Sequence, residues 1–191
     1  MQSLGATFVE LTYSPDVLAR AQARDADAFC SLCRPYEDRL FRQAVALCRD
    51  QALAEDLVQE TLIEAWKSLH RFNGRCRLFT WFCSIMLHRY HKMIRRKRPP
   101  ALNDETLYTV ADDQPTPAAK MEGIDQDLWL QSCLDRLPHK QRQVVYLRFY
   151  VENSLQEIAA AVQCSVGTVK SRLFKGLENL RQMRRLRELD F

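Results

Sequence analysis

The sequence predicts an all-α protein with two small helical domains that a flexible acidic linker joins. Only 5 of the 191 residues are glycines, and long stretches lack both glycine and proline, so helix is the expected local structure. Apolar residues recur at spacings of three and four in several stretches, as they do on the buried face of an amphipathic helix. Basic, acidic and basic segments follow one another along the chain, which indicates two surfaces for polyanions with a different segment between them.

The first predicted domain covers residues 14–98. Ser14 and Pro15 suit a helix start, with the hydroxyl as the cap and the proline at the first helical position. A long amphipathic pattern follows, and Pro35 inside it should end or kink a helix. The apolar positions of this pattern are Phe29, Leu32, Tyr36, Leu40, Ala44 and Leu47.

Two further helices are expected in this domain. The apolar stripe of the first consists of Leu57, Val58, Thr61, Leu62, Ala65, Trp66 and Leu69. Its polar face carries Asp56, Gln59, Glu60, Glu64 and Lys67. A loop with Asn73 and Gly74 breaks the pattern, and the second helix begins near Leu78. That helix ends at Pro99, after a basic cluster formed by Arg89, Lys92, Arg95, Arg96, Lys97 and Arg98.

Residues 99–123 form the predicted linker. The prolines of this segment are Pro99, Pro100, Pro115 and Pro117, and its acids are Asp104, Glu105, Asp112, Asp113 and Glu122. Because no helical or strand periodicity persists here, we expect an extended tether between the domains.

The second predicted domain, residues 124–191, is a set of short helices. The first carries Leu130, Cys133, Leu134 and Leu137. The second starts at Pro138 and should bury Val144, Leu147, Phe149 and Val151. Ser154 and Glu157 have the spacing of a capping box, which indicates the start of a third helix. Ser165 is suited to cap a fourth.

The last two helices have the pattern of a DNA-reading pair. Ala159 is small where two crossing helices must approach, and Ile158, Val162 and Val169 supply apolar contact. A recognition helix needs small residues at its start, so that it can enter the groove, and cations beside them for phosphates. The small or polar residues here are Gly167, Thr168 and Ser171, and the cations are Lys170, Arg172 and Lys175. A helical hairpin with a solvated basic face is the alternative, and Gln163 stands at a turn position where glycine is common in such motifs.

The cysteines and the N-terminus indicate a cytoplasmic protein that does not insert into membranes. The first residues, MQSLGATFVELTYS, lack a basic region followed by an apolar run, and no window has the roughly 20 apolar residues of a membrane span. The seven cysteines are an odd, scattered set, which fits free thiols in a reducing compartment.

Neither a metal site nor an active site is expected. Cys30 and Cys33 have the CxxC spacing of zinc ligands, but they lie within a helical pattern and no second pair occurs. Small buried hydrophobic residues are therefore the favoured interpretation, with no metal and no cofactor. The chain also lacks a nucleophile–base arrangement, a glycine-rich phosphate loop and an HExxH motif, so we expect no enzyme.

Two stretches resemble one family in that family's order. The C-terminal stretch reads SLQEIAAAVQCSVGTVKSRLFKGLENLR, and it resembles region 4, the DNA-binding region, of extracytoplasmic-function (group 4) sigma factors of the bacterial sigma-70 family. The preceding LPHKQRQVVYLRFYVENSLQEIA looks like the start of the same region. An earlier stretch resembles region 2 of the same family. It reads AEDLVQETLIEAWKSLHRFNG, followed by LFTWFCSIMLHRYHKMIRRKRP. In length and general appearance the chain also resembles the sigma factors of cobalt–nickel resistance, although no residue indicates metal sensing.

The resemblance implies a protein that binds core RNA polymerase, recognises the −35 and −10 promoter elements and melts DNA. Residues 14–98 then correspond to region 2 and residues 124–191 to region 4. Asp56, Gln59 and Glu60 match the positions that dock on the clamp coiled coil of the largest polymerase subunit. Family members are usually held inactive by an anti-sigma factor, often membrane-anchored, and we expect the free chain to be a monomer.

The resemblance also assigns −10 contacts. The loop with Phe72 and Asn73 borders the pocket for a flipped base, and Trp81 and Phe82 match positions that support the melted edge. For Trp81, simple core packing is the alternative. His88 stands where the family often has asparagine, and it can contact DNA together with Arg89 and His91. Arg95 and Arg96 suit duplex phosphates. The acidic linker resembles the segment in the RNA exit channel, with a solvated tether as the alternative.

The sequence is also compatible with two other classes of protein. A stand-alone metal- or redox-sensing helix-turn-helix repressor would dimerise on a palindromic site, although no heptad or other dimerisation helix is evident. A polymerase-independent nucleic-acid remodelling protein would bind DNA tightly without sequence preference.

Overall fold

Helices form every regular element of the part of the chain that the structure describes. The computed structural model describes residues 13–97 and 126–189, and within these two ranges it contains α- and 3-10 helices and no strand. The prediction of an all-α fold with two helical domains is confirmed. The predicted linker, residues 99–123, and the domain boundaries beside it lie outside the described residues.

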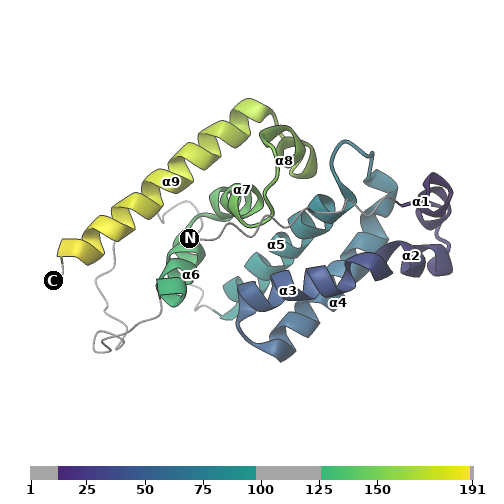
Figure 1. Ribbon diagram of the computed structural model, residues 1–191, viewed down its shortest axis with the longest axis horizontal. Coiled ribbons are helices and arrows are strands. Elements are labelled where there is room, and N and C mark those ends of the chain that lie inside the picture. Colours follow the sequence, from purple (N-terminus) through teal and green to yellow (C-terminus); the bar gives the residue numbers. More distant parts are fainter. Residues whose placement is uncertain (1–12, 98–125, 190–191) are drawn as a thin grey trace, which may run out of the picture.

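The N-terminal helices α1 and α2 lie at one end of the molecule, and α3 lies nearer its middle (Figure 1). Pro35 separates α2 from α3. The N-terminal elements are α1 (Pro15–Gln22), α2 (Ala26–Cys33), the 3-10 turn η1 (Arg34–Tyr36) and α3 (Glu37–Cys48). The expected break at Pro35 is confirmed, since the chain leaves α2 through this turn. The expected hydroxyl cap at Ser14 is wrong, because that side chain makes no cap hydrogen bond, although Pro15 does occupy the first turn of α1. The side chain of Asp25 caps α2 instead, accepting from the Ala28 amide at 3.0 Å.

Two long helices complete the first domain. These are α4 (Gln51–Ser68) and α5 (Leu78–Lys97), with the 3-10 turn η2 (Leu69–Arg71) between them. Asp50 caps α4 by accepting from the Leu53 amide at 2.9 Å. The predicted apolar stripe of α4 packs toward the core against α3 and α5, with Leu57, Thr61 and Ala65 fully buried. The polar face of α4 is thereby left on the outside.

The second domain consists of three shorter helices and one long one. They are α6 (Gln126–Arg136), α7 (His139–Phe149), α8 (Leu155–Ala161) and α9 (Val166–Leu189). The expectation of short helices is wrong for α9, which runs for 24 residues because no proline follows Ser165 and Gly176 is tolerated within it. The expected burial of Phe149 is also wrong, since it is 54 % exposed. Phe149 lies about 200° around the helix from buried Leu147.

Helix α7 has apolar residues on two sides. Val144, Tyr146 and Leu147 belong to a core that includes residues of the first domain. Val145 belongs to a second cluster with Leu134 and Leu137, against which Leu173, Leu180 and Met183 pack. Accordingly α7 contacts both α5 and α9, and Figure 1 shows it between them. The two domains therefore touch directly through α7.

The predicted helix-turn-helix is present in α8 and α9. Ser154 and Glu157 form the capping box in both directions, as expected. Ile158, Ala159 and Val169 are buried where the helices cross. Gln163 adopts φ +53° in the turn, the left-handed conformation that explains why glycine suits this position. Within the described ranges, no helix combines the length and the apolar character that crossing a membrane requires.

Gly176 allows the close approach of α9 to α7, and its replacement should destabilise the fold. An added Cβ would lie 2.9 Å from Val145 Cγ2 and 3.4 Å from Gln141 Cβ. We expect Gly176→Ala to lower the free energy of unfolding by about 1–3 kcal/mol, because Val145 is buried and β-branched and has little room to shift. Urea unfolding followed by circular dichroism measures the change.

Gly167→Ala is the matched control in the same helix. Its added Cβ would meet nothing closer than Ser165 Oγ at 3.7 Å, so stability should stay equal or rise slightly. Equal effects of the two substitutions would show that Gly176 is not needed for helix contact.

Candidate nucleic-acid interface

The N-terminus of α9 is held by a local cap and faces solvent. Ser165 Oγ accepts a hydrogen bond from the Thr168 amide at 3.1 Å and lies 2.9 Å from Thr168 Oγ1. The predicted contact residues Gly167, Lys170, Ser171 and Lys175 are exposed, whereas Thr168 and Arg172 are half-buried. Arg172 lies beside the turn, with its Nη1 3.8 Å from Cys164 Sγ. All six predicted −35 residues therefore lie on the first turns of one helix.

A hollow of about 770 Å³ adjoins these first turns. The start of α7 lines one side of it and the start of α9 the other, through Pro138, His139, Lys140, Gln141, Ser165, Gly167, Thr168, Ser171, Arg172 and Lys175. Helix N-termini and cationic side chains both favour an anion such as a phosphate group. His139 and Lys140, which directly follow Pro138 at the start of α7, were not predicted from the sequence to lie beside these residues of α9.

The predicted polymerase-docking residues lie on the outer face of α4. Asp56 and Gln59 are exposed. Glu60 is half-buried, and its Oε2 lies 2.9 Å from Arg89 Nη2 and accepts from Arg89 Nε at 3.0 Å. The Nη1 of Arg89 lies 3.7 Å from Glu64 Oε2. Glu60 and Arg89, which the sequence assigned to different surfaces, thus pair with each other and tie α4 to α5.

The loop after α4 has a buried side and an exposed side. Phe72 is buried, with its ring centroid 5.4 Å from that of Trp81. Asn73 is exposed, and its Oδ1 accepts from the Arg75 amide at 3.1 Å across a turn in which Gly74 has φ +71°. The Gln22 side chain donates to the Phe72 carbonyl at 2.8 Å and fixes the loop on α1. Sequence reasoning missed Gln22, because a bond over 50 residues leaves no local signal.

Trp81 and Phe82 lie inside the first domain. Trp81 is 7 % exposed and Phe82 is fully buried, with ring centroids 5.6 Å apart. Both residues are buried, so core packing describes the position of both. From there they can support the loop that carries Asn73, because the tilted Phe72 ring packs against Trp81.

The C-terminal half of α5 meets the second domain. His88, Arg95 and Arg96 are exposed. His91 stacks on His139 with centroids 4.4 Å apart, and its Nδ1 lies 2.8 Å from Arg142 Nη2. Since a guanidinium only donates, this His91 nitrogen is the acceptor. Part of the predicted −10 surface is thus covered by α7.

Four of the seven cysteines are buried, namely Cys33, Cys76, Cys83 and Cys133, whereas Cys48 and Cys164 are half-buried. The expected burial is wrong for Cys30, which is exposed. Burial raises the pKa of the Cys33 thiol to about 12 and that of Cys76 to about 11, so both stay protonated at neutral pH. Across the described ranges, no group of three or more His, Cys, Asp or Glu side chains is arranged to hold a metal ion.

Two family models match the chain in order. Residues 32–99 match Sigma-70 region 2, and residues 133–182 match Sigma-70, region 4. Among curated proteins, the ECF RNA polymerase sigma factor SigX of Bacillus subtilis is 32% identical, over 85% of this chain and 87% of that protein. The RNA polymerase sigma-H factor of Pseudomonas aeruginosa is 28% identical, over 85% of this chain and 89% of that protein.

Solved structures share the fold. CnrH in complex with the cytosolic domain of CnrY aligns with a TM-score of 0.57 at 21% identity, over 90% of this chain and 96% of that one. The sigma factor RpoE of Bartonella quintana, in complex with the anti-sigma factor NepR, aligns with a TM-score of 0.51 at 23% identity, over 82% of this chain and 96% of that one. Together with the match to SigX and to both region models, these findings confirm the resemblance: the chain belongs to the ECF RNA polymerase sigma factors of the sigma-70 family.

Proposed function

We propose that this sigma factor acts in the cytoplasm, binds core RNA polymerase through the outer face of α4 and reads promoter DNA through the loop after α4, through α5 and through α9. The observation that carries the proposal is the capped start of α9, whose first three turns expose Gly167, Lys170, Ser171 and Lys175 beside a basic hollow. Recognition of duplex DNA needs slim polar groups for base edges and cations for phosphates. Both occur here on neighbouring turns.

At the −35 element, we propose that the start of α9 enters the major groove. Ser171 is small and polar and suits a base edge, whereas Lys175 suits the backbone. The hollow between α7 and α9 suits the adjacent phosphate, because Lys140 and Arg172 line it from two helices. Two helix N-termini at one phosphate site add their partial positive charges.

For polymerase binding, the exposed face of α4 supports a polar docking surface. Asp56 and Gln59 are exposed, and Ile63, one turn after Gln59, is 54 % exposed beside them. A mainly polar face with one apolar residue suits a partner that is exchanged. Glu60 has a second part in this proposal, because it holds Arg89 against α4. A partner that draws Glu60 away would release Arg89 toward DNA.

At the −10 element, Asn73 and His88 are the exposed polar groups suited to an unstacked base. Arg95 and Arg96 suit the phosphates of the upstream duplex. Trp81 and Phe82 act from the core of the first domain, where they hold Phe72 and the loop in position. In this proposal none of these residues carries out catalytic chemistry, since the polymerase supplies it.

Regulation by an anti-sigma factor is also proposed. The similar sigma factor RpoE is bound to the anti-sigma factor NepR, and CnrH is bound to the cytosolic domain of CnrY. An inhibitor of this chain would cover the α4 face and the basic surfaces, and a membrane anchor on that inhibitor would connect it to an external stimulus.

Promoter-specific transcription tests the proposed function. With purified core polymerase and a randomised promoter library, the chain should yield transcripts that share two sequence elements upstream of the start site. Sequencing of the transcribed templates measures this outcome. Transcripts without shared elements would contradict it, as would tight DNA binding by a dimer without polymerase, which a stand-alone repressor would show.

Removal of the α4 docking groups should weaken core binding. We expect Asp56→Arg with Gln59→Ala to lower the affinity for core polymerase by about tenfold or more, since a charge reversal opposes the partner surface. Fluorescence titration of the labelled chain with core measures the affinity. Asp27→Arg, the same charge change on exposed α2, is the control and should bind as the wild type does. Equal loss in both variants would point to net charge instead of the α4 face.

Ser171 and Lys175 should have different effects on −35 binding. We expect Ser171→Ala to change the preferred base at one −35 position, because a good base contact contributes about 1–3 kcal/mol to discrimination. We expect Lys175→Ala to weaken binding to all −35 sequences and to reduce the salt dependence. Promoter-library selection with reconstituted holoenzyme separates these effects. An unchanged −35 motif with Ser171→Ala would exclude Ser171 from the groove.

A further inference from the structure

The loop that carries Asn73 is tied at its start to the N-terminal helix α1. Gln22 is the last residue of α1, and its Nε2 donates to the Leu69 carbonyl at 3.1 Å and to the Phe72 carbonyl at 2.8 Å. A side-chain amide carries two N–H groups, so one glutamine can serve both carbonyls. Gln22 therefore joins the two ends of the 3-10 turn η2, through which the chain leaves α4.

The two carbonyls that Gln22 reaches lie where water has little access. Leu69 and Phe72 are 1 % and 5 % exposed. Carbonyl groups at the end of a helix lack partners within it, and a buried acceptor that loses its donor destabilises the arrangement that buries it. Without the Gln22 amide, the backbone at Leu69 and Phe72 must therefore shift before water can replace this donor.

The ring of Phe72 is held from two sides. Its centroid lies 6.4 Å from that of Tyr13, with the two rings edge to face, and 5.4 Å from that of Trp81 on α5. The tip of the loop, in contrast, is exposed at Asn73 and at the two residues after it. Because Asn73 directly follows Phe72, the direction of the backbone at Phe72 determines where the exposed Asn73 side chain lies.

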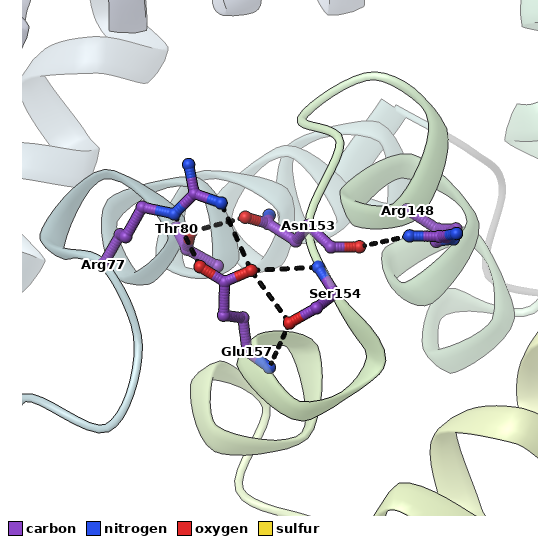
Figure 2. Close-up of polar contacts among 6 residues, drawn as sticks. All are labelled: Arg77, Thr80, Arg148, Asn153, Ser154 and Glu157. Atoms are coloured by element: carbon purple, nitrogen blue, oxygen red, sulfur yellow. Dashed lines mark hydrogen bonds and ion pairs between the residues drawn. The ribbon is translucent and has the colours of Figure 1, made fainter. Parts of the chain in front are cut away.

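Different contacts hold the other end of the loop (Figure 2). Arg77 directly precedes α5, and its Nε lies 2.5 Å from Glu157 Oε1 while its Nη2 donates to Glu157 Oε2 at 3.3 Å. The hydrogen bond from Arg77 lowers the pKa of Glu157, so this pair is charged at neutral pH. One turn later, the Thr80 hydroxyl donates to Asn153 Oδ1 at 2.7 Å. These contacts fix the end of the loop, whereas Gln22 fixes its start.

We propose that Gln22 is a positioning residue for −10 recognition: through the Leu69 and Phe72 carbonyls it holds the loop in the form that presents Asn73 to an unstacked base. The inference rests on the proposed function of this loop. It gives α1 a part in promoter selection, although α1 lies outside residues 32–99, the range that matches region 2. Because only the held form reads the base, the apparent affinity falls in proportion to the fraction of that form.

Gln22→Met tests the proposal in reconstituted holoenzyme. Methionine has a similar length and no donor, so it keeps the packing and removes both hydrogen bonds. The first probe is a single-stranded −10 oligonucleotide of the sequence that the wild type selects. The second is the same oligonucleotide with an abasic site at the base whose removal weakens wild-type binding most.

The two probes should respond differently to Gln22→Met. We expect the variant to bind the intact oligonucleotide about three- to thirtyfold more weakly than the wild type does. Its affinity for the abasic oligonucleotide should not change, because that probe offers the loop no base. Fluorescence anisotropy measures both affinities, and a merely structural role of Gln22 would lower both of them equally, which would overturn the proposal.

Arg24→Met is the matched control. Arg24 lies two residues after Gln22, and its guanidinium donates to the Trp66 carbonyl at 3.0 Å and to the Lys67 carbonyl at 3.3 Å. The substitution removes two bonds to the last turn of α4 but none to the loop, so the ratio of the two affinities should stay at the wild-type value. An equal fall of this ratio in Arg24→Met and Gln22→Met would attribute the effect to general loosening of the N-terminal helices and overturn the proposal.

Gln22→Lys provides the second test, because lysine is also long and supplies donors. Its affinity for the intact oligonucleotide should lie closer to the wild-type value than that of Gln22→Met. Wild-type affinity in Gln22→Met, or an equal loss in both substitutions, would contradict the role of the hydrogen bonds. If the wild-type holoenzyme binds every abasic oligonucleotide as tightly as the intact one, the loop reads no base. The proposed function then fails and the inference with it, so the two failures give different results.

Discussion

The double burial of α7 is the constraint on which the rest of the structure depends. Val144, Tyr146 and Leu147 join a core shared with α5, whereas Val145 packs in the cluster that receives α9. An 11-residue helix with apolar groups on both sides must be covered on both sides. Its contact with α9 orients the recognition helix, and its contact with α5 orients the two domains. The same short helix thus sets the geometry of both proposed DNA surfaces.

Two arginines near these surfaces are held in ion pairs with carboxylates of the same chain. Arg89 lies between two carboxylates of α4, and Arg142, almost fully buried, pairs with Asp135 at 3.2 Å. A buried guanidinium without a carboxylate would be strongly unfavourable, so Asp135 must accompany Arg142 whenever the domains are in contact. Of these two arginines, Arg89 is a predicted DNA contact, and in this arrangement Glu60 and Glu64 of the same chain pair with it.

The sequence predicted the features that depend on neighbouring residues. The break at Pro35, the stripe of α4 and the capping box of α8 follow from local sterics and spacing, and all three are confirmed. The expectation of short helices is wrong for α9, in which Gly176 lies inside the helix and allows its contact with α7.

Contacts between the domains could not be predicted in this way. Thr80 and Asn153 are 73 residues apart, and Arg77 and Glu157 are 80 apart. Nothing in the residues around each one indicates its partner. For the same reason, His91 was assigned only to DNA, although it stacks on His139. The assignments of individual residues to DNA and to polymerase stay predictions, because they concern contacts with other molecules and not contacts within the chain.

The contact between the domains combines polar pairs with a shared apolar core. Separation would expose the apolar groups to water, at about 25 cal/mol for each Å². Thr80, Asn153, Arg77 and Glu157 would exchange their mutual bonds for bonds to water, so their net contribution to the contact is modest. The Arg77 side chain is also 41% exposed, which lets salt screen its pair with Glu157.

A change of pH affects the Arg77–Glu157 pair only when acid protonates Glu157, which weakens the pair. Because the pKa of Glu157 is lowered in the folded chain, its contribution to the contact is complete above the ordinary glutamate value near 4.5 and is lost as the pH falls through the lowered value. At neutral pH the pair is thus insensitive to pH. A change of pH near neutrality therefore leaves this link between α5 and α8 unchanged.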